Sequence, residues 1–230
     1  MTEHPSRWLS ARVAGVILAG GRNTRMGGRD KAFLRVDGET VFARTLGVLR
    51  RCFAEVVVVS NTPEKYADFH VDVIGDELRD CGPLGGLHAG LGRITAPYAF
   101  VAACDMPFLH VEPIRYLVAR LREQDAIVPR WDGDIEPLHA VYAARLRTPI
   151  AGAIAGGARA MRDFLPQIAV EYVPQAAMER VTGAAEAFRN VNTPEEAARF
   201  AVQVAGEQHG RQELAGQERP SSTRTRAHTE

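Results

Sequence analysis

The sequence lacks several features that would mark a specialised class of protein. Only three cysteines occur in 230 residues, Cys52, Cys81 and Cys104, and no two of them form a C-x-x-C pair. This argues against a zinc ribbon or a disulfide framework and favours a reducing, cytoplasmic compartment. The 28 basic and 28 acidic residues give a net charge of zero. No overall field therefore attracts nucleic acid, an anionic membrane or an acidic partner, and any anion site must be local.

Long apolar runs are missing as well. No stretch approaches the roughly 20 apolar residues that cross a bilayer, and the opening residues MTEHP lack the basic start and apolar run of a signal peptide. The sequence therefore predicts a protein that is neither exported nor embedded in a membrane. Two common nucleotide-binding patterns are also absent, because GxxxxGK[ST] occurs nowhere and no GxGxxG follows a predicted strand. Kinase and dehydrogenase interpretations lose support accordingly.

The chain does contain a regular alternation of short apolar runs and amphipathic segments. This alternation is typical of a parallel sheet with helices on both faces. We therefore predict a single α/β domain with a doubly wound, mostly parallel sheet, in which ligands bind beyond the C-terminal ends of the strands. The predicted strands are residues 13–18, 55–59, 71–74, 98–103 and 126–128, and the predicted helices are residues 40–53, 85–93 and 112–123.

Composition predicts where the folded domain begins and ends. Residues 1–11 are predicted to be a disordered polar segment, and residues 12–205 are predicted to form the domain. A last helix is expected after Thr193, which is a good N-cap followed by a proline and completed by a glutamate in a capping box. Residues 206–230 contain one leucine and no Phe, Trp or Tyr. Such a segment buries too little apolar surface to offset chain entropy, so we expect a disordered tail.

A glycine-rich loop with basic residues leaves the C-terminal end of the first predicted strand. It reads LAGGRNTRMGGRDK over residues 18–31. Glycines such as Gly20 and Gly21 let backbone N–H groups converge on phosphate oxygens, while Arg25 and Lys31 supply positive charge. The loop is predicted to hold a polyphosphate. The alternative is a flexible turn with solvated arginines.

Polar side chains follow three further strands. Asp105, in CDMP, ends the strand at 98–103, and one carboxylate that faces bound phosphates suffices for Mg²⁺; the alternative is a helix N-cap. Asn61 can hydrogen-bond a base or ribose, or is a turn residue. Asp76 precedes CGPLGG at 81–86, which either opens a helix whose N-terminus favours an anion or flat base, or is a plain turn.

A pair of asparagines precedes the last predicted helix. Asn190 and Asn192 lie in NVNTP, and their side chains point the same way if this segment is extended. In that case they can orient a second substrate or the metal. Asparagine before a helix is also commonly structural, and both interpretations stay open.

The motifs LAGG, RMGGxDK, GPLxG, CDMP and NVNTPEE occur in this order between Val13 and about Phe200. In combination they resemble the molybdenum cofactor guanylyltransferases, which are MobA-type enzymes of the nucleotide-diphospho-sugar transferase-like superfamily with a Rossmann-like α/β fold. The resemblance implies contacts to guanine nucleotide, to its phosphates, to the nucleoside, to Mg²⁺ (with Mn²⁺ as the alternative) and to molybdopterin. Leu18, Ala19 and Gly20 would contact the guanine nucleotide, Arg25 and Lys31 its phosphates, and Asn61 and Asp76 the nucleoside. Asp105 would bind the metal, and Asn190 and Asn192 would contact molybdopterin.

The sequence departs from this family pattern at two places. Gly85 stands where the family usually has alanine, and residues 23–24 replace a serine-containing pair. Both changes preserve small size or hydrogen-bonding capacity. The pair Gly20 and Gly21, where related cytidylyltransferases tend to show two alanines, favours guanine over cytosine. His139 lies in a segment that resembles the acceptor side of the family, and we interpret it as a buried strand residue rather than a catalyst.

The resemblance implies a cytoplasmic enzyme that transfers GMP from GTP to the phosphate of molybdopterin and releases pyrophosphate. Arg25, Lys31 and Asp105 are its expected catalytic residues. The alternatives are a transferase that uses CTP with molybdopterin or a nucleotide with a sugar phosphate, and a non-catalytic molybdopterin carrier. Besides its two substrates, the expected partners are molybdopterin-delivering proteins or apo-molybdoenzymes in transient contact, with no nucleic acid and no membrane.

Overall fold

The structure of the chain, a computed structural model, describes residues 12–20, 31–36 and 38–189. Its strands are β1 Val13–Leu18, β2 Arg35–Val36, β3 Glu39–Thr40, β4 Val56–Val59, β5 Asp72–Ile74, β6 Tyr98–Ala103, β7 Ala126–Trp131, β8 Asp134–Ile135, β9 His139–Ala143 and β10 Val170–Val173. Its α-helices are α2 Val41–Cys52, α3 Gly82–Arg93, α4 Val111–Ala119, α5 Arg147–Ala155, α6 Met161–Phe164, α7 Gln175–Met178 and α8 Ala184–Ala187. Short 3₁₀ helices are η1 Lys31–Phe33, η2 Pro63–Phe69, η3 Ala144–Leu146 and η4 Leu165–Gln167.

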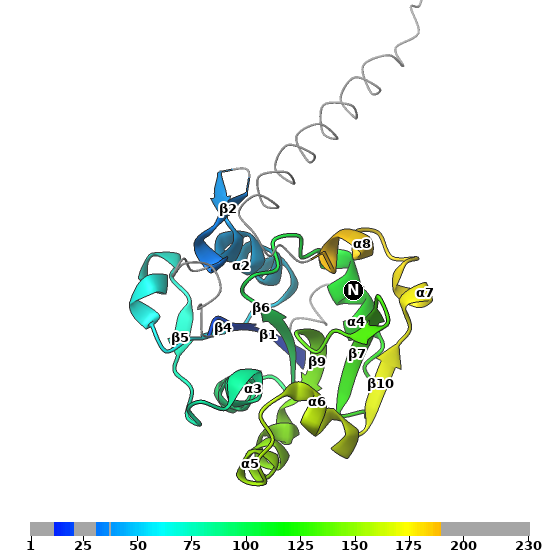
Figure 1. The fold of residues 1–230 in the computed structure, drawn as a ribbon. Coiled ribbons are helices and arrows are strands. Elements are labelled where there is room, and N and C mark those ends of the chain that lie inside the picture. The colour runs from blue at the N-terminus through cyan, green and yellow to red at the C-terminus, as the bar shows by residue number, and fades with distance from the viewer. Residues whose placement is uncertain (1–11, 21–30, 37, 190–230) are drawn as a thin grey trace, which may run out of the picture.

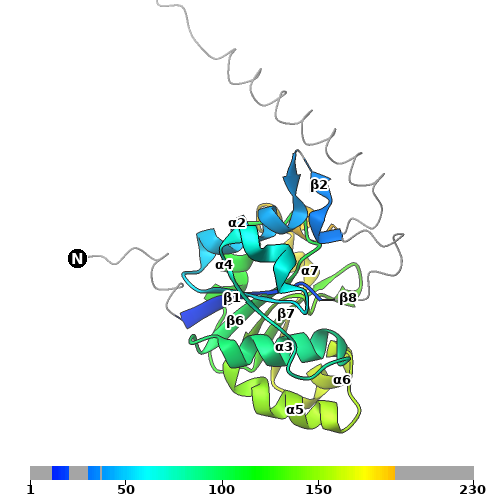
Figure 2. The same ribbon diagram turned by 90° about the vertical axis from the view of Figure 1, so that its left-hand side faces the viewer.

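A central sheet of eight strands organises the molecule. Seven of them follow the order β10-β7-β9-β6-β1-β4-β5, and β8 pairs with β7. β1 is parallel to both of its neighbours, β4 and β6, and only β9 and the short β8 run antiparallel to the strands beside them. α2 and α4 cover one face, and α3 and α5 cover the other (Figures 1 and 2). The predicted α/β class and the mostly parallel, doubly wound sheet are confirmed.

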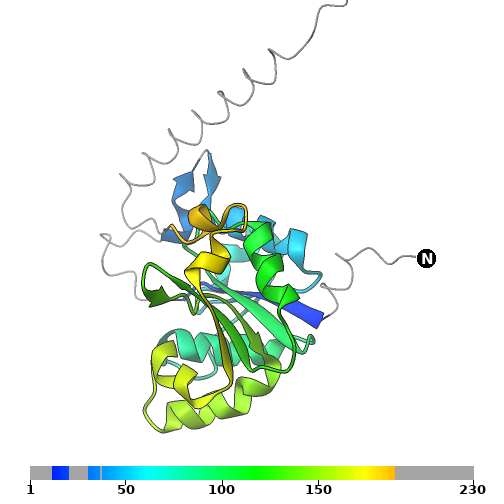
Figure 3. The ribbon, with the colours of Figure 1, turned by 90° about the vertical axis from the view of Figure 1, so that its right-hand side faces the viewer.

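The strand order reverses beside β1. The chain passes from β1 outward through β4 and β5, and then returns to place β6 on the opposite side of β1. In doubly wound sheets this reversal leaves a crevice at the C-terminal strand ends, where ligands bind. The small antiparallel hairpin of β2 and β3 stands clear of the main sheet at this end of the molecule (Figure 3).

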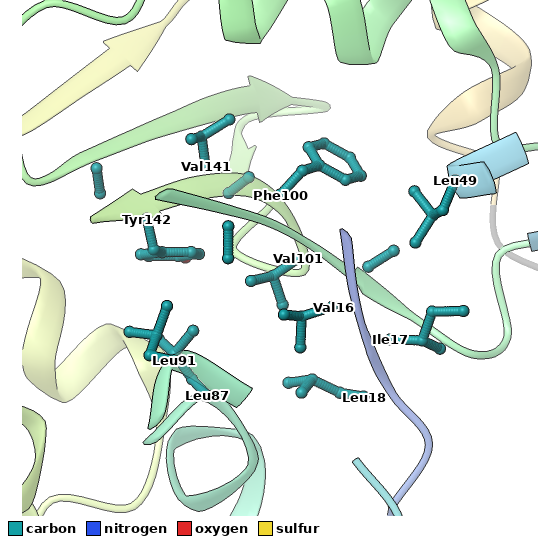
Figure 4. Close-up of a cluster of buried hydrophobic side chains, with 14 of the residues drawn as sticks. Val16, Ile17, Leu18, Leu49, Leu87, Leu91, Phe100, Val101, Val141 and Tyr142 are labelled. Carbon is teal, nitrogen blue, oxygen red and sulfur yellow. The ribbon is translucent and has the colours of Figure 1, made fainter. Parts of the chain in front are cut away.

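The core forms because alternate strand residues face opposite helix layers. Figure 4 shows Phe100 and Val141 on one side of the sheet and Tyr142 on the other, where Leu87 and Leu91 of α3 lie. All five side chains are at most 3% exposed. Both faces of the central strands are therefore buried, as their continuous apolar runs predict.

Close approach of α3 to β1 depends on one glycine. A Cβ atom added at Gly90 would lie 2.6 Å from Cγ1 of Val16 and 3.4 Å from Cγ2 of Val59. Even the methyl group of alanine does not fit there without movement. The missing side chain lets the helix pack directly on the strands whose ends form the crevice.

Most predicted elements occur close to their expected positions. α2 begins after Thr40, whose hydroxyl accepts a hydrogen bond from the Ala43 amide at 3.2 Å. The helix predicted at residues 112–123 is shorter, because it ends at Ala119. Beyond it the amides of Arg120 and Leu121 bind carbonyls three residues back, and the Gln124 side chain binds the Arg120 carbonyl at 3.1 Å. The chain thus tightens and turns away before the predicted end.

Some sequence predictions fall outside the described residues. These are the polar segment at 1–11, the last helix after Thr193 and the tail at 206–230, so the domain boundaries stay predictions. Among the helices that the structure does describe, none combines the length and apolar character needed to span a bilayer.

Candidate functional site

A pocket of about 700 Å³ lies at the C-terminal ends of β1, β4 and β5, beside the start of α3. It brings together five residues that the sequence singled out: Leu18, Ala19, Gly20, Asn61 and Asp76. A second hollow of about 670 Å³, beside α5 and α6, is lined mainly by glycine, alanine and apolar side chains and contains none of the predicted residues. The first pocket is therefore the candidate site.

Asn61 and Asp76 form a hydrogen-bonded pair across the pocket edge. The Asn61 amide nitrogen donates to Oδ2 of Asp76 at 3.0 Å, and the Asp76 backbone amide donates to Oδ1 of Asn61 at 2.9 Å. This double link joins the chain just beyond β4 to the chain just beyond β5. It leaves Oδ1 of Asp76 near Gly86, 3.7 Å from where a Cβ atom of that residue would lie. The pair presents a fixed carboxylate oxygen beside the pocket.

The start of the glycine-rich loop is held by its neighbours. The Cys104 amide donates to the Leu18 carbonyl at 3.1 Å, and the Ala19 amide donates to the Val59 carbonyl at 2.9 Å. The hydroxyl of buried Tyr66 donates to the Ala19 carbonyl at 3.5 Å, a long contact. A Cβ atom at Gly20 would meet no described atom within 4 Å. Packing among the described residues therefore does not require a glycine there.

The start of α3 forms another wall of the pocket. Gly82 and Pro83 open the helix, and its N-cap residue Cys81 makes no capping hydrogen bond through its side chain. Free amide groups of a first helical turn are suited to an anion or to a polar ligand edge. Gly85 has a packing reason, because a Cβ atom there would lie 2.7 Å from the Leu78 carbonyl oxygen. The alanine usual at this position does not fit the loop that precedes α3 in this chain.

Asp105 follows β6, which lies on the side of β1 opposite to β4 and β5. It is half-buried in the turn after β6, one residue beyond Cys104, and it is not among the residues that line the pocket. The N-cap interpretation is wrong, because α4 begins at Val111 with His110 as its N-cap. Buried Thr45 donates a hydrogen bond to the Met106 carbonyl at 3.2 Å and so holds the next residue of the turn. Asp105 therefore occupies the end of β6, beside the end of β1.

The described residues contain no group of three or more histidine, cysteine or acidic side chains arranged to hold a metal. A closed protein cage is thus absent from this part of the chain. A single oxygen donor such as Asp105 fits a different arrangement, in which one carboxylate shares a hard cation with ligand phosphates and water.

Several predicted residues are not placed by the structure. Lys31 begins η1, but its side chain is outside the described part, as are the whole of Gly21 and Arg25 in the loop. Asn190 and Asn192 also lie outside the described residues. The phosphate side and the acceptor side of the site therefore stay predictions.

His139 is a buried strand residue, as predicted. It lies in β9 with no exposed surface, and its ring centroid is 5.2 Å from that of Phe100 and 4.6 Å from that of Phe188. Within the described residues neither ring nitrogen has a hydrogen-bond partner. Burial lowers the pKa of His139 from 6.5 to about 3. The imidazole is therefore neutral at physiological pH and has no contact with solvent.

Two charged pocket residues were missed by sequence reasoning. Lys65 lies in η2, whose start is marked by Pro63 in the first helical turn, a signal that predicts such an element. Asp80 lines the pocket with a left-handed backbone, at φ 58°. No motif marks Asp80, because its position depends on how the loop before α3 folds.

Taken together, the reversal beside β1, the pocket at the strand ends and the open helix N-terminus define a doubly wound nucleotide-binding α/β protein. Residues 15–173 match the family model of the MobA-like NTP transferase domain. The chain belongs to this family and is a nucleotidyltransferase.

Similar proteins support the assignment to this family over most of the chain. A molybdenum cofactor guanylyltransferase of Syntrophotalea carbinolica is 36% identical over 193 residues, which cover 83% of this chain and 91% of the relative. One of Desulfosudis oleivorans is 33% identical over 185 residues, covering 80% and 92%. Molybdopterin-guanine dinucleotide biosynthesis protein A of Archaeoglobus fulgidus superposes with a TM-score of 0.72 at 26% identity, covering 84% of this chain and 99% of that protein. Enzymes of this kind usually work with a divalent metal.

Proposed function

We propose that this chain transfers GMP from GTP to the terminal phosphate of molybdopterin, giving molybdopterin guanine dinucleotide and pyrophosphate in the cytoplasm. The observation that carries the proposal is the pocket at the ends of β1, β4 and β5, which gathers Leu18, Ala19, Gly20, Asn61 and Asp76. Relatives named for this activity match the chain over more than three quarters of its length. A family match and a pocket at the expected strand ends thus point to the same chemistry.

The charges of the pocket favour guanine over cytosine. Its charged side chains are Asp76, Asp80 and Lys65, so carboxylate oxygens outnumber cations there. Guanine carries an N2 amino group and an adjacent N1–H, which are donors suited to a carboxylate, whereas the Watson–Crick edge of cytosine offers one donor and two acceptors. We therefore assign this pocket to the nucleoside rather than to the phosphates. The alternatives are CTP as donor, or a sugar phosphate as acceptor.

The phosphates are assigned to the glycine-rich loop and the metal to Asp105. Gly20 and Gly21 offer backbone N–H groups, while Arg25 and Lys31 supply positive charge. Asp105 would hold Mg²⁺, or Mn²⁺ in its place, together with phosphate oxygens. The bound cation would neutralise charge on the triphosphate as pyrophosphate leaves.

In the proposed reaction, an oxygen of the molybdopterin phosphate bonds to the α-phosphorus of GTP, and the bond from that phosphorus to the bridging oxygen of pyrophosphate breaks. No protein base is needed, because a phosphate monoester with a second pKa of about 6 is mostly dianionic at neutral pH. The protein fixes the nucleoside through Asn61 and Asp76, stabilises charge through Arg25 and Lys31, and orients the acceptor through Asn190 and Asn192.

Pyrophosphate release tests the proposal directly. With molybdopterin and Mg²⁺, we expect pyrophosphate from GTP at a rate well above that from CTP, and none without molybdopterin. A pure molybdopterin carrier would release none under any of these conditions, and faster release from CTP would contradict the assignment of guanine. Delivery of the product also predicts transient contact with molybdopterin-supplying proteins or apo-molybdoenzymes, which a pull-down from molybdoenzyme-producing cells would detect.

A further inference from the structure

An ion pair fastens the loop that carries Asp76. Glu77 is the next residue, and both of its carboxylate oxygens accept hydrogen bonds from Nη2 of Arg147, at 3.0 and 2.8 Å. Arg147 is the first residue of α5, 70 positions further along the chain. α5 lies alongside α3 on one face of the sheet (Figures 1 and 2). The contact therefore ties the edge of the pocket to a helix outside it.

Two residues at this contact are unfavourable for the stability of the helices that contain them. Arg147 places a positive charge at the N-terminus of α5, where the helix dipole opposes it, and the first turn has no acidic residue to compensate. Gly92 lies in the last turn of α3, although glycine is a weak helix former. A Cβ atom there would lie 2.6 Å from Nε and 2.7 Å from Cζ of Arg147. Both residues are explained if the Arg147 side chain must cross Gly92 to reach Glu77.

A third side chain faces the same carboxylate. Nδ1 of His88, on α3, is 3.8 Å from Oε2 of Glu77, and His88 is only 7% exposed. Burial lowers the pKa of His88, so the neutral ring faces Glu77 at neutral pH. Arg147 is therefore the charged partner of Glu77 at this contact.

The loop from residue 75 to residue 81 is held near its two ends by the Asn61–Asp76 pair and by buried Cys81. Between these ends Leu78 packs against the core, and four of the seven loop residues, Gly75, Glu77, Arg79 and Asp80, are exposed. Segments with little buried apolar surface owe their order to the polar contacts that remain. Asp76 and Asp80 both line the pocket from this loop. The ion pair of Glu77 thus adds to the contacts that order two pocket carboxylates.

We propose that Arg147, acting through Glu77, is a positioning residue for the nucleotide pocket and increases the affinity of the enzyme for its guanine nucleotide. This inference rests on the proposed function of the same pocket. Arg147 does not line the pocket, so its effect is indirect: it holds the loop in the conformation that presents Asp76 and Asp80.

The test compares GTP binding and turnover in Glu77→Gln, Arg147→Met and Gly92→Ala. The first two remove the ion pair while keeping side-chain length, and the third displaces the guanidinium without touching either charge. We expect the Kd and KM for GTP to rise about fivefold, as the loss of a surface ion pair allows, with kcat within about twofold of the original. The double exchange Glu77→Arg with Arg147→Glu should recover part of the affinity.

A second surface ion pair, between α3 and β5, provides a matched control. Arg93, at the end of α3, pairs with Asp72 of β5 at 2.7 Å and is similarly exposed, but it lies at the opposite end of the strand. Arg93→Met and Asp72→Asn should therefore leave the Kd for GTP within about twofold. Equal loss of affinity in both sets, or unchanged affinity in Glu77→Gln and Arg147→Met, would overturn the proposal.

Hydrogen exchange separates this inference from the proposed function. In Arg147→Met without nucleotide, amides of residues 77–81 should exchange faster, while amides of β6 should not change. If the unaltered protein binds no GTP, the proposed function fails, and exchange still reports whether Arg147 orders the loop. Unchanged exchange at residues 77–81 would reject the role of Arg147 on its own.

Discussion

At the scale of single residues, the pocket depends on side chains that hold one another. Asn61 and Asp76 exchange two hydrogen bonds, at 3.0 and 2.9 Å, between the ends of two strands. A carboxylate fixed by a neighbouring amide loses little conformational freedom when a ligand binds, which favours affinity. Asp105 occupies the end of β6 in a turn whose next carbonyl is held by Thr45. Binding and metal ligation are thus assigned to side chains at separate strand ends.

Asp105→Asn and Lys31→Ala should lose turnover and remain folded. Both changes remove charge at the expected phosphate and metal positions, so we expect kcat to fall about 100-fold or more. Pyrophosphate release under saturating GTP and molybdopterin measures this, and circular dichroism follows the fold. Asp68→Asn, in exposed η2, is the matched control and should keep the original rate. Near-original turnover in Asp105→Asn would reject Asp105 as the metal ligand.

His139 predicts acid sensitivity. The pKa of His139 is about 3 in the folded protein and 6.5 ordinarily. Between these values the unfolded chain binds a proton at His139 and the folded chain does not. Stability should therefore fall as the pH drops from 6.5 towards 3, by at most about 5 kcal/mol from this group. Urea unfolding from pH 7 to pH 4 should show a shallower decline in His139→Leu than in the original protein. Parallel stability curves for the two proteins would contradict the assigned pKa.

At the scale of elements, helices on the two faces of the sheet use glycine differently. Gly90 of α3 faces β1, where a Cβ atom would lie 2.6 Å from Val16, whereas a Cβ atom at Gly47 of α2 would meet no described atom within 4 Å. Only the first glycine is required by packing. The second merely weakens its helix.

This contrast gives a paired stability prediction. Gly90→Ala should destabilise the fold by about 1–3 kcal/mol, because the stiff Val16 side chain in a fully buried strand must move. Gly47→Ala should stabilise it by about 0.5–1 kcal/mol through better helix propensity. Chemical denaturation of both variants measures the difference. A stabilised Gly90→Ala protein would show that α3 can shift away from β1 at little cost.

At the scale of the whole molecule, the sheet topology brings distant segments to one edge. The ends of β1, β4, β5 and β6 all carry assigned residues, because parallel strands finish at the same side of the sheet. Arg147 of α5 also reaches this region, where its side chain donates a hydrogen bond to Glu77 in the loop after β5. The protein is therefore expected to unfold as one unit from residue 12 to residue 205.

Removal of residues 206–230 tests that expectation. Their composition offers almost no apolar surface, so a chain that ends at residue 205 should keep the unfolding midpoint within about 2 °C and the turnover within about twofold. Differential scanning calorimetry and the pyrophosphate assay measure these two quantities. A large fall in the unfolding midpoint would mean that the tail contributes to the folded domain.

Much of the fold could be predicted because local patterns carry it. The apolar run at residues 13–18 and the apolar face of residues 40–53 gave β1 and α2 at nearly their observed bounds. The helix at 112–123 was overestimated, since Gln124 binds the Arg120 carbonyl and helps end it early. Lys65 and Asp80 escaped prediction because their place in the pocket depends on loop conformation rather than on spacing.

The amino-acid sequence alone determined the α/β class, the family and the strand ends to which the site is assigned, because hydrophobic period and motif order are local properties of the chain. Only the tertiary structure decided that Asn61 pairs with Asp76, that Gly85 makes room for the Leu78 carbonyl and that Arg147 reaches Glu77. These contacts join residues whose meeting depends on the path of the intervening chain. Sequence spacing does not encode that path, whereas the packed sheet and its helices fix it.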